Sequence, residues 1–190
     1  MSQTKTSLLR PERTALVVVD LQEKLMPAIE NRERVVRNSL LLLKLAEVLK
    51  LPVLLTTQYR KGLGEILPEV RAAAPGASPL DKIAFGCFGD AAFEERLRGL
   101  GRDQLVVAGV EAHICVCQTV LGGLEKGYTV HVASDAVGSR TPENREVGLA
   151  RMERAGAWLS SAEMALYELL GRSDRDAFKQ VLPLLKGPPA

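Results

Sequence analysis

The stretch "TALVVVD" (residues 14–20) is a continuous apolar run, rich in β-branched residues, that ends on an acid. Such residues favour strands, and a strand without polar alternation is buried on both faces, as in parallel sheets. The stretch therefore predicts a central parallel strand with Asp20 at its carboxyl end.

Outward from this run, strand-like and helix-like segments alternate along the chain. Strands that alternate with helices of ten or more residues imply right-handed crossovers and helices on both faces of the sheet. We therefore predict an α/β, three-layer Rossmann-like fold with a mostly parallel sheet. The segment 78–90 is predicted as a loop, and Asn31 is a candidate N-cap. The other predicted strands are 51–58, 104–110, 128–137 and 157–161, and the predicted helices are 31–50, 115–127, 142–156, 161–171 and 174–185.

Composition limits the class of protein. The chain has 190 residues, of which 46% are hydrophobic and 25% charged, so it can form one domain with its own core. Three irregularly spaced cysteines argue against a disulfide framework and for a reducing compartment. The apolar runs are too short for a signal peptide or a membrane span. A net charge of +2 with both signs interspersed gives no nucleic-acid surface. We expect a single cytoplasmic domain over residues 1–190.

In a parallel sheet, ligands bind at the carboxyl ends of the strands, near the point where the strand order reverses. This rule selects a small set of candidate site residues. Those at or just past a predicted strand end are Asp20, Gln58, Tyr59, Val110, Glu111, His113 and Cys115.

Cys115 opens a predicted helix directly after a strand. The unpaired first-turn amides and the helix dipole at such a position favour a thiolate and can hold an oxyanion. The alternative is a buried cysteine that packs on the sheet. Cys117 lies about 200° around the helix axis from Cys115. We therefore expect Cys117 to be a core residue rather than a second nucleophile.

Other polar residues leave two interpretations open. Asp20 is either a general base or a cap for the segment that follows it. Lys82 is either solvated or drawn inward by its apolar neighbours, and near a thiol it would lower the pKa of that thiol. His113 is expected to line the pocket, whereas Cys87 and His131 are expected to pack. No glycine-rich dinucleotide motif and no phosphate-binding loop follows the first strand.

Several segments together resemble the isochorismatase-like cysteine hydrolase family. They are "ALVVVDLQEKL", "PVLLTTQYRKGLG", "DKIAFGCF", "VVAGVEAHICVCQTVLGGLEKGYTVHVASDAVGSR" and "AGAWLSSAEMALYELLG", in the order that the family has them. The resemblance covers a core of about residues 14–171. The "QYRKGLG" and "EAHICV" segments resemble most the isochorismatase-domain proteins whose substrates are mostly undefined.

This resemblance implies a sheet of about six strands and a catalytic triad of Asp20, Lys82 and Cys115. In that triad Asp20 takes the thiol proton, and Lys82 holds the pair and stabilises negative charge. The thiolate attacks a carbonyl carbon, and water later releases the acyl-enzyme. Relatives of this kind are often homo-oligomers in which a neighbouring subunit supplies pocket walls.

The resemblance also implies a cis peptide bond between Val110 and Glu111. We expect this bond to aim backbone amides at the oxyanion, among them those of Ile114 and Cys115.

Substrate-binding residues are predicted around this centre. Gln58 and Tyr59 could hydrogen-bond to a substrate or stack on it, and Gln22, Phe85 and His113 complete the set, although His113, like Glu111, could equally stabilise a loop. Nicotinamidases of the family carry a histidine metal site after the second strand. The corresponding "TTQYRKGLG" has no histidine, so we expect no metal and no cofactor.

The function predicted is a cysteine-dependent hydrolase of a small amide or related acyl compound. Two alternatives remain. One is a non-catalytic member that binds a metabolite or a protein partner in the same pocket. The other is a vinyl-ether hydrolase of the isochorismate type, which would not need Cys115.

Overall fold

The computed structural model describes residues 7–185. Its strands are β1 (Thr14–Val19), β2 (Val53–Gln58), β3 (Leu80–Lys82), β4 (Gln104–Val110), β5 (Thr129–Gly138) and β6 (Trp158–Ser160). Its α-helices are α1 (Arg32–Leu49), α2 (Arg60–Leu63), α3 (Pro68–Ala73), α4 (Ala91–Gly99), α5 (Cys117–Glu125), α6 (Pro142–Arg154), α7 (Ala162–Leu170) and α8 (Asp176–Leu185). Three shorter helical segments are η1 (Met26–Ala28), η2 (Cys87–Gly89) and the π-helix η3 (Ala112–Val116).

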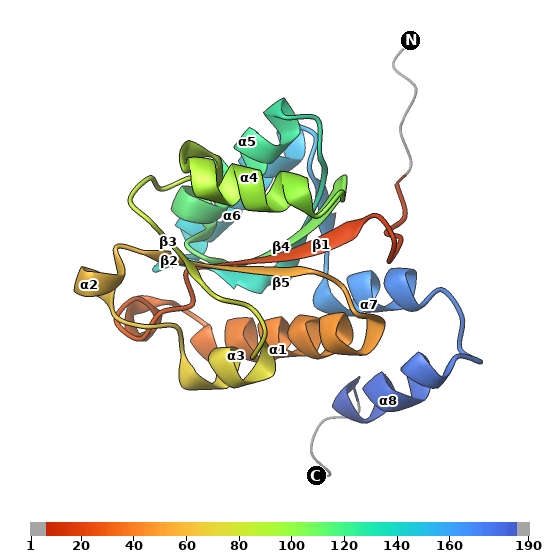
Figure 1. The fold of residues 1–190 in the computed structure, drawn as a ribbon. Helices are drawn as coiled ribbons and strands as arrows, with labels where there is room; N and C mark the ends of the chain where they lie inside the picture. The colour runs from red at the N-terminus through yellow and green to blue at the C-terminus, as the bar shows by residue number, and fades with distance from the viewer. Residues whose placement is uncertain (1–6, 186–190) are drawn as a thin grey trace.

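The six strands form one sheet in the order β3-β2-β1-β4-β5-β6. Every neighbouring pair is parallel. Helices α4, α5 and α6 cover one face of the sheet, and α1, α3 and α7 cover the other (Figure 1). The prediction of a three-layer α/β fold with about six strands is therefore confirmed, and the sheet is parallel throughout.

The central strand β1 shows why its sequence is apolar without alternation. All six of its residues are buried. Leu16 and Val18 belong to the core under α1 and α7, whereas Ala15, Val17 and Val19 belong to the core under α4, α5 and α6. A strand covered on both faces needs apolar side chains at every position.

The residues expected at the helix ends occupy those positions in part. Gly127 and Gly156 adopt positive φ after α5 and α6, as glycines that close helices do. Asn31 does precede α1, but its side chain makes no capping hydrogen bond. The helix expected from Cys115 onward begins as the π-helix η3 and becomes regular only at Cys117. Within residues 7–185, no helix has both the length and the apolar character needed to cross a membrane.

The prediction of a loop over residues 78–90 was wrong in part. This segment contains β3, which pairs with β2 through Thr56–Leu80 and Gln58–Lys82, and it also contains η2. β3 has three residues, two of them charged, so its sequence lacks the apolar run that marked the other strands. Helices α2, α3 and α4 were not predicted either, because each buries at most two side chains and shows little periodicity.

The strand order reverses between β1 and β4. From β1 the chain builds outward through β2 and β3, then returns to the other side of β1 with β4 and builds through β5 and β6. At Gly109 in β4, φ is +115° and a Cβ atom would lie 2.0 Å from the carbonyl oxygen of Val19. Only glycine permits this approach of β4 to the end of β1, directly beside Asp20.

Candidate active site

Side chains from four separate segments meet at the carboxyl edge of the sheet. Asp20 follows β1, Gln58 ends β2, Lys82 ends β3, and Cys115 lies in η3 after β4. Because all strands are parallel, these ends share one edge, at the reversal point where ligands bind in such sheets. β3 lies two strand spacings from β1, about 10 Å. The ammonium group of Lys82 therefore reaches across β2 to Asp20.

The Lys82 ammonium group uses all three of its donors inside the protein. Nζ lies 2.7 Å from Asp20 Oδ2, 2.8 Å from Gln58 Oε1 and 3.0 Å from the Phe85 carbonyl oxygen. The two charged side chains are 1% and 0% exposed. A charge this deeply buried is tolerated only when it is paired and fully hydrogen-bonded. Lys82 is drawn inward, as one of the two interpretations of its sequence predicted.

The Asp20 carboxylate is fixed from two sides. Its Oδ2 accepts from Lys82, and its Oδ1 accepts from the Thr56 hydroxyl at 2.7 Å. The backbone of Asp20 has φ +53°, a left-handed conformation that aspartate tolerates better than most residues. The backbone therefore turns directly after β1 and does not continue the strand. The carboxylate stays buried beside β2.

The Cys115 thiol lies beside this ion pair and is 7% exposed. Burial is the main cause that raises its pKa, to about 12. The Asp20 charge raises this pKa further, as does a hydrogen bond that the thiol donates to Asp20, and Lys82 opposes the rise. Burial and the neighbouring anion thus act against the thiolate that the helix start was expected to favour.

The other two cysteines are buried. Cys117 is 2% exposed in the core under α5, and burial raises the pKa of its thiol. Cys87 is fully buried, and its backbone N–H donates to the Thr119 hydroxyl at 3.0 Å. Cys115 is the most exposed of the three, at 7%.

The loop between β4 and α5 contains a cis peptide bond between Val110 and Glu111. The Glu111 carbonyl oxygen accepts from the amides of Ile114 at 3.0 Å and Val116 at 3.2 Å. The Ile114 amide, predicted to face an oxyanion, is therefore already bonded within the loop.

Glu111 and His113 both contact the segment that follows β5. Glu111 Oε2 accepts from the backbone N–H of Arg140 at 3.0 Å and from its Nε at 3.1 Å. His113 Nδ1 lies 3.0 Å from Ser139 Oγ. These contacts tie the loop after β4 to the end of β5, which supports the loop-stabilising interpretation of both residues.

Gln22 and Gln58 are occupied by internal hydrogen bonds. The Gln22 amide is fully buried and bonds to the Gln58 backbone N–H, the Gln58 carbonyl and the Gly64 carbonyl. Gln58 accepts from Lys82 through Oε1 and donates to the Ile83 carbonyl through Nε2. Both amides thus brace the edge around Lys82, and Gln58 Nε2 keeps one N–H group beyond its bond to Ile83.

Exposed apolar side chains lie close to the buried pair. Tyr59 is 49% exposed, Ile83 71% and Phe85 55%. They flank Lys82 directly: the Tyr59 N–H donates to the Lys82 carbonyl, and the Lys82 ammonium donates to the Phe85 carbonyl. We call these three residues the apolar rim. Two of them, Tyr59 and Phe85, were predicted to contact substrate.

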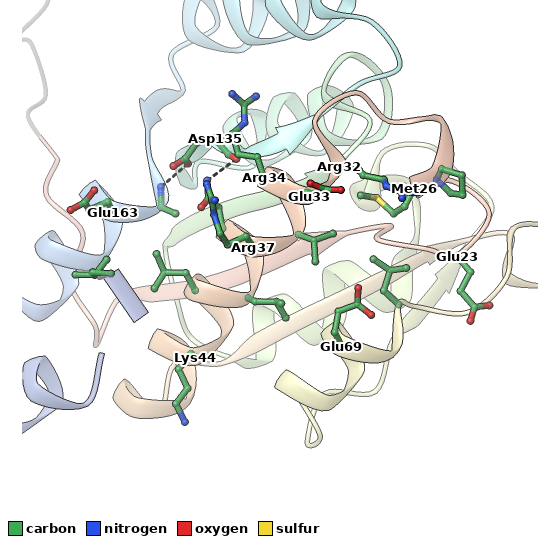
Figure 2. A pocket seen from close by; sticks show the side chains of 18 residues that line it. Glu23, Met26, Arg32, Glu33, Arg34, Arg37, Lys44, Glu69, Asp135 and Glu163 are labelled. Carbon is green, nitrogen blue, oxygen red and sulfur yellow. Dashed lines mark hydrogen bonds between the residues drawn. The ribbon is translucent and has the colours of Figure 1, made fainter. Parts of the chain in front are cut away.

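The larger of two described cavities, about 1120 Å³, lies elsewhere. Figure 2 shows it along the outer side of α1, with Arg34 and Arg37 near Asp135 at one end and Glu69 of α3 along its length. Asp20, Lys82 and Cys115 do not line it, nor do they line the second cavity. Size alone does not locate the chemistry, because the buried charges and the nucleophile lie at the carboxyl edge. Among residues 7–185, no group of three or more His, Cys, Asp or Glu side chains is arranged to hold a metal ion.

Two contacts of the site residues were missed from the sequence. Thr56 was assigned only to a strand, although a hydroxyl at a fully buried strand position indicates a polar partner. Arg140 was not singled out because nothing in its local sequence marks a bond to Glu111, 29 residues earlier.

Sequence comparison gives one family match and close relatives. The model of the isochorismatase domain matches residues 14–164. The chain is 36% identical over 191 residues to isochorismatase domain-containing protein 2A of Mus musculus. The alignment covers 99% of this chain and 91% of the mouse protein.

Solved structures give the same fold. MAR1 ribonuclease from Caenorhabditis elegans has a TM-score of 0.90 at 35% identity, covering 97% of this chain and 95% of that one. YcaC from Pseudomonas aeruginosa, with hexane-2,5-diol and covalent acrylamide, has a TM-score of 0.90 at 28% identity, with 96% and 93% covered. YcaC from Escherichia coli, an octameric hydrolase of unknown specificity, has a TM-score of 0.91 at 27% identity, with 96% and 91% covered.

Proposed function

The chain belongs to the isochorismatase-domain family, and from this premise we propose that it is a cysteine-dependent hydrolase of a small amide or related acyl compound. One observation carries the proposal. Three distant segments bring a carboxylate and an ammonium group into a buried ion pair and a thiol beside it, where the charges of both Asp20 and Lys82 act on the pKa of Cys115. Nucleophile, base and orienting group in this order are the elements of covalent catalysis.

The proposed reaction starts from the neutral thiol. As the Cys115 sulfur attacks the carbonyl carbon, its proton passes to Asp20, and Lys82 balances the negative charge of the tetrahedral intermediate. Asp20 gives this proton to the leaving amine, and a thioester on Cys115 remains. Water then attacks the thioester, its proton passes through Asp20 to the sulfur, and the acid is released. Because burial and the Asp20 charge raise the pKa of Cys115, the thiol in this scheme loses its proton only as the sulfur attacks.

A relative supports the choice of a nucleophilic mechanism. The Pseudomonas YcaC structure contains covalent acrylamide. Acrylamide is an electrophile that thiolates attack readily, and a thiolate is the stronger nucleophile at neutral pH among common side chains. In this chain the equivalent chemistry would fall to Cys115, since it is the most exposed of the three cysteines, at 7% against 0% for Cys87 and 2% for Cys117.

The substrate would meet the apolar rim on its way to the thiol. Tyr59, Ile83 and Phe85 expose large apolar surfaces beside Lys82. The E. coli YcaC octamer supports a homo-oligomeric state for this family. We propose that a second copy of the chain covers the apolar rim and supplies further walls of the substrate pocket, so that Tyr59 and Phe85 contact both substrate and neighbour.

The first test is selective alkylation. Iodoacetamide should modify Cys115 faster than Cys87 or Cys117 at neutral pH, as followed by tandem mass spectrometry of the proteolytic peptides. Equal, slow labelling of the three cysteines would count decisively against a nucleophilic Cys115.

The second test is a substrate screen with the wild-type protein and Cys115→Ala. Amides, carbamoyl compounds and isochorismate should be tried, together with RNA, because one neighbour is a ribonuclease. We expect turnover of an amide or carbamoyl compound that Cys115→Ala abolishes while the circular dichroism spectrum is kept. Isochorismate cleavage that survives Cys115→Ala would establish the vinyl-ether alternative. Ligands that bind both proteins equally and are never turned over would establish the non-catalytic one.

A further inference from the structure

We propose that Thr56 is a positioning residue that holds the Asp20 carboxylate in one orientation toward Cys115, an inference that rests on the function proposed above. Thr56 lies in β2, is fully buried, and donates its hydroxyl proton to Asp20 Oδ1 at 2.7 Å. Valine has the same shape and suits a buried strand better. A hydroxyl here costs desolvation unless its hydrogen bond has a use.

The two oxygens of the Asp20 carboxylate have different partners. Lys82 holds Oδ2 at 2.7 Å and Thr56 holds Oδ1 at 2.7 Å. Rotation of the carboxylate about its Cβ–Cγ bond would break both contacts. Lys82 supplies charge, whereas Thr56 supplies direction, because a single O–H group donates to one oxygen along one line.

Cys87 makes a weak contact with the Thr56 hydroxyl. Its sulfur lies 4.0 Å from Thr56 Oγ1 and donates to it. Burial raises the pKa of Cys87 to about 11, so this group is a thiol at neutral pH and can act as the donor. The hydroxyl oxygen accepts from Cys87, and the hydroxyl proton is left for Asp20. The titratable groups that face Asp20 are thus Lys82 from β3, Cys87 from η2 and Cys115 from η3.

The test is the pH dependence of Cys115 alkylation in Thr56→Val. A hydrogen bond to a carboxylate stabilises its ionised form over the neutral acid. Without that bond the thiol–carboxylate pair keeps its proton up to a higher pH. The acid limb of the alkylation profile, where the rate rises with pH, therefore moves to higher pH. A bond to a charged group corresponds to a shift of roughly 1 to 2 pH units.

Two control variants separate positioning from packing. Thr56→Ser keeps the hydroxyl and should keep the wild-type acid limb. Thr57→Val removes the neighbouring buried hydroxyl, which donates to Asp81 Oδ1 at 2.9 Å and not to Asp20, and it should also leave the acid limb in place. An unshifted profile in folded Thr56→Val overturns the proposal, and so does an equal shift in Thr57→Val or in Thr56→Ser. If Thr56→Val does not fold, Thr56→Ala must show the same shift.

Alkylation reports on the thiol and needs no substrate. A Thr56→Val shift combined with no turnover of any amide would leave the positioning role standing and overturn the hydrolase. Turnover that depends on Cys115, combined with an unshifted Thr56→Val profile, would do the reverse.

Discussion

Lys82 is the residue on which the buried charge balance depends. Replacing it with methionine keeps most of the stem volume but leaves the Asp20 carboxylate buried without its cation. Breaking a buried pair from one side costs roughly 3–5 kcal/mol. We therefore expect Lys82→Met to lower the free energy of unfolding by about that amount, measured by urea denaturation.

Two further variants test whether this loss comes from the unpaired charge. Lys44→Met removes an exposed pair with Glu47 and should cost well under 1 kcal/mol. Adding Asp20→Asn to Lys82→Met removes the orphaned charge and should recover part of the stability. A double variant no more stable than Lys82→Met would show that packing, and not charge, sets the loss.

His131 predicts a pH dependence of stability. Its side chain is 3% exposed and stacks on Trp158 at 6.3 Å between ring centres, and among the described residues its Nε2 has no hydrogen-bond partner. Burial lowers its pKa, against the opposing charge of Glu168. Below about pH 6.5 the unfolded chain binds a proton that the folded protein resists, so stability is lost as pH falls.

The variant His131→Phe keeps the ring stack and removes this titration. Comparing unfolding free energies at pH 7.5 and 5.5 should show a smaller decline in His131→Phe than in the wild type. Identical declines in the two proteins would mean that His131 does not contribute.

Among the elements, the contact between β1 and β4 is the most restrictive. Gly109→Ala would place a Cβ atom 2.0 Å from the Val19 carbonyl oxygen at a φ of +115°. The strands must then separate beside Asp20, so we expect the free energy of unfolding to fall by several kcal/mol. At the roughly 2–4 °C per kcal/mol usual for a chain of this size, the thermal midpoint should fall by about 10 °C or more. The control Gly99→Ala has open space and lies at the end of α4, so it should be neutral or slightly stabilising.

How far the elements could be predicted depended on what each one buries. β1 and β4 are buried along their whole length, so their apolar runs marked them in the sequence. β3 was missed because its three residues gain their strand conformation from pairing with β2 and not from their own composition. The π-helix η3 was missed because its turn depends on the Glu111 carbonyl that accepts two amides.

On the scale of the whole molecule, the apolar rim predicts an association between copies. If a second copy covers the apolar rim, Ile83→Glu should lower the mass measured by multi-angle light scattering and reduce Cys115-dependent turnover together. Leu8→Glu is the matched control. Leu8 is 70% exposed, close to the 71% of Ile83, but its carbonyl accepts from Gln104 at the opposite, amino edge of the sheet. A mass unchanged in Ile83→Glu would refute this contact.

The assembly of the candidate site could be predicted only in outline. Strand ends and family resemblance singled out Asp20, Lys82 and Cys115, and the fold brings these residues together. The raised pKa of the thiol could not be predicted, because burial and the Asp20 charge come from distant segments. The Thr56–Asp20 contact, 36 residues apart in sequence, was hidden for the same reason.

The cation of the site is carried by β3, one of the two short edge strands of the sheet. β3 has three residues, stands at the edge and pairs only with β2. Edge segments with few hydrogen bonds open locally long before a domain melts. Mild denaturant should therefore abolish the proposed turnover while the far-ultraviolet spectrum is still native, with the β3 amides exchanging with deuterium far faster than those of β1. Substitutions that stabilise the pairing of β3 with β2 would then raise resistance to inactivation without any change to the core.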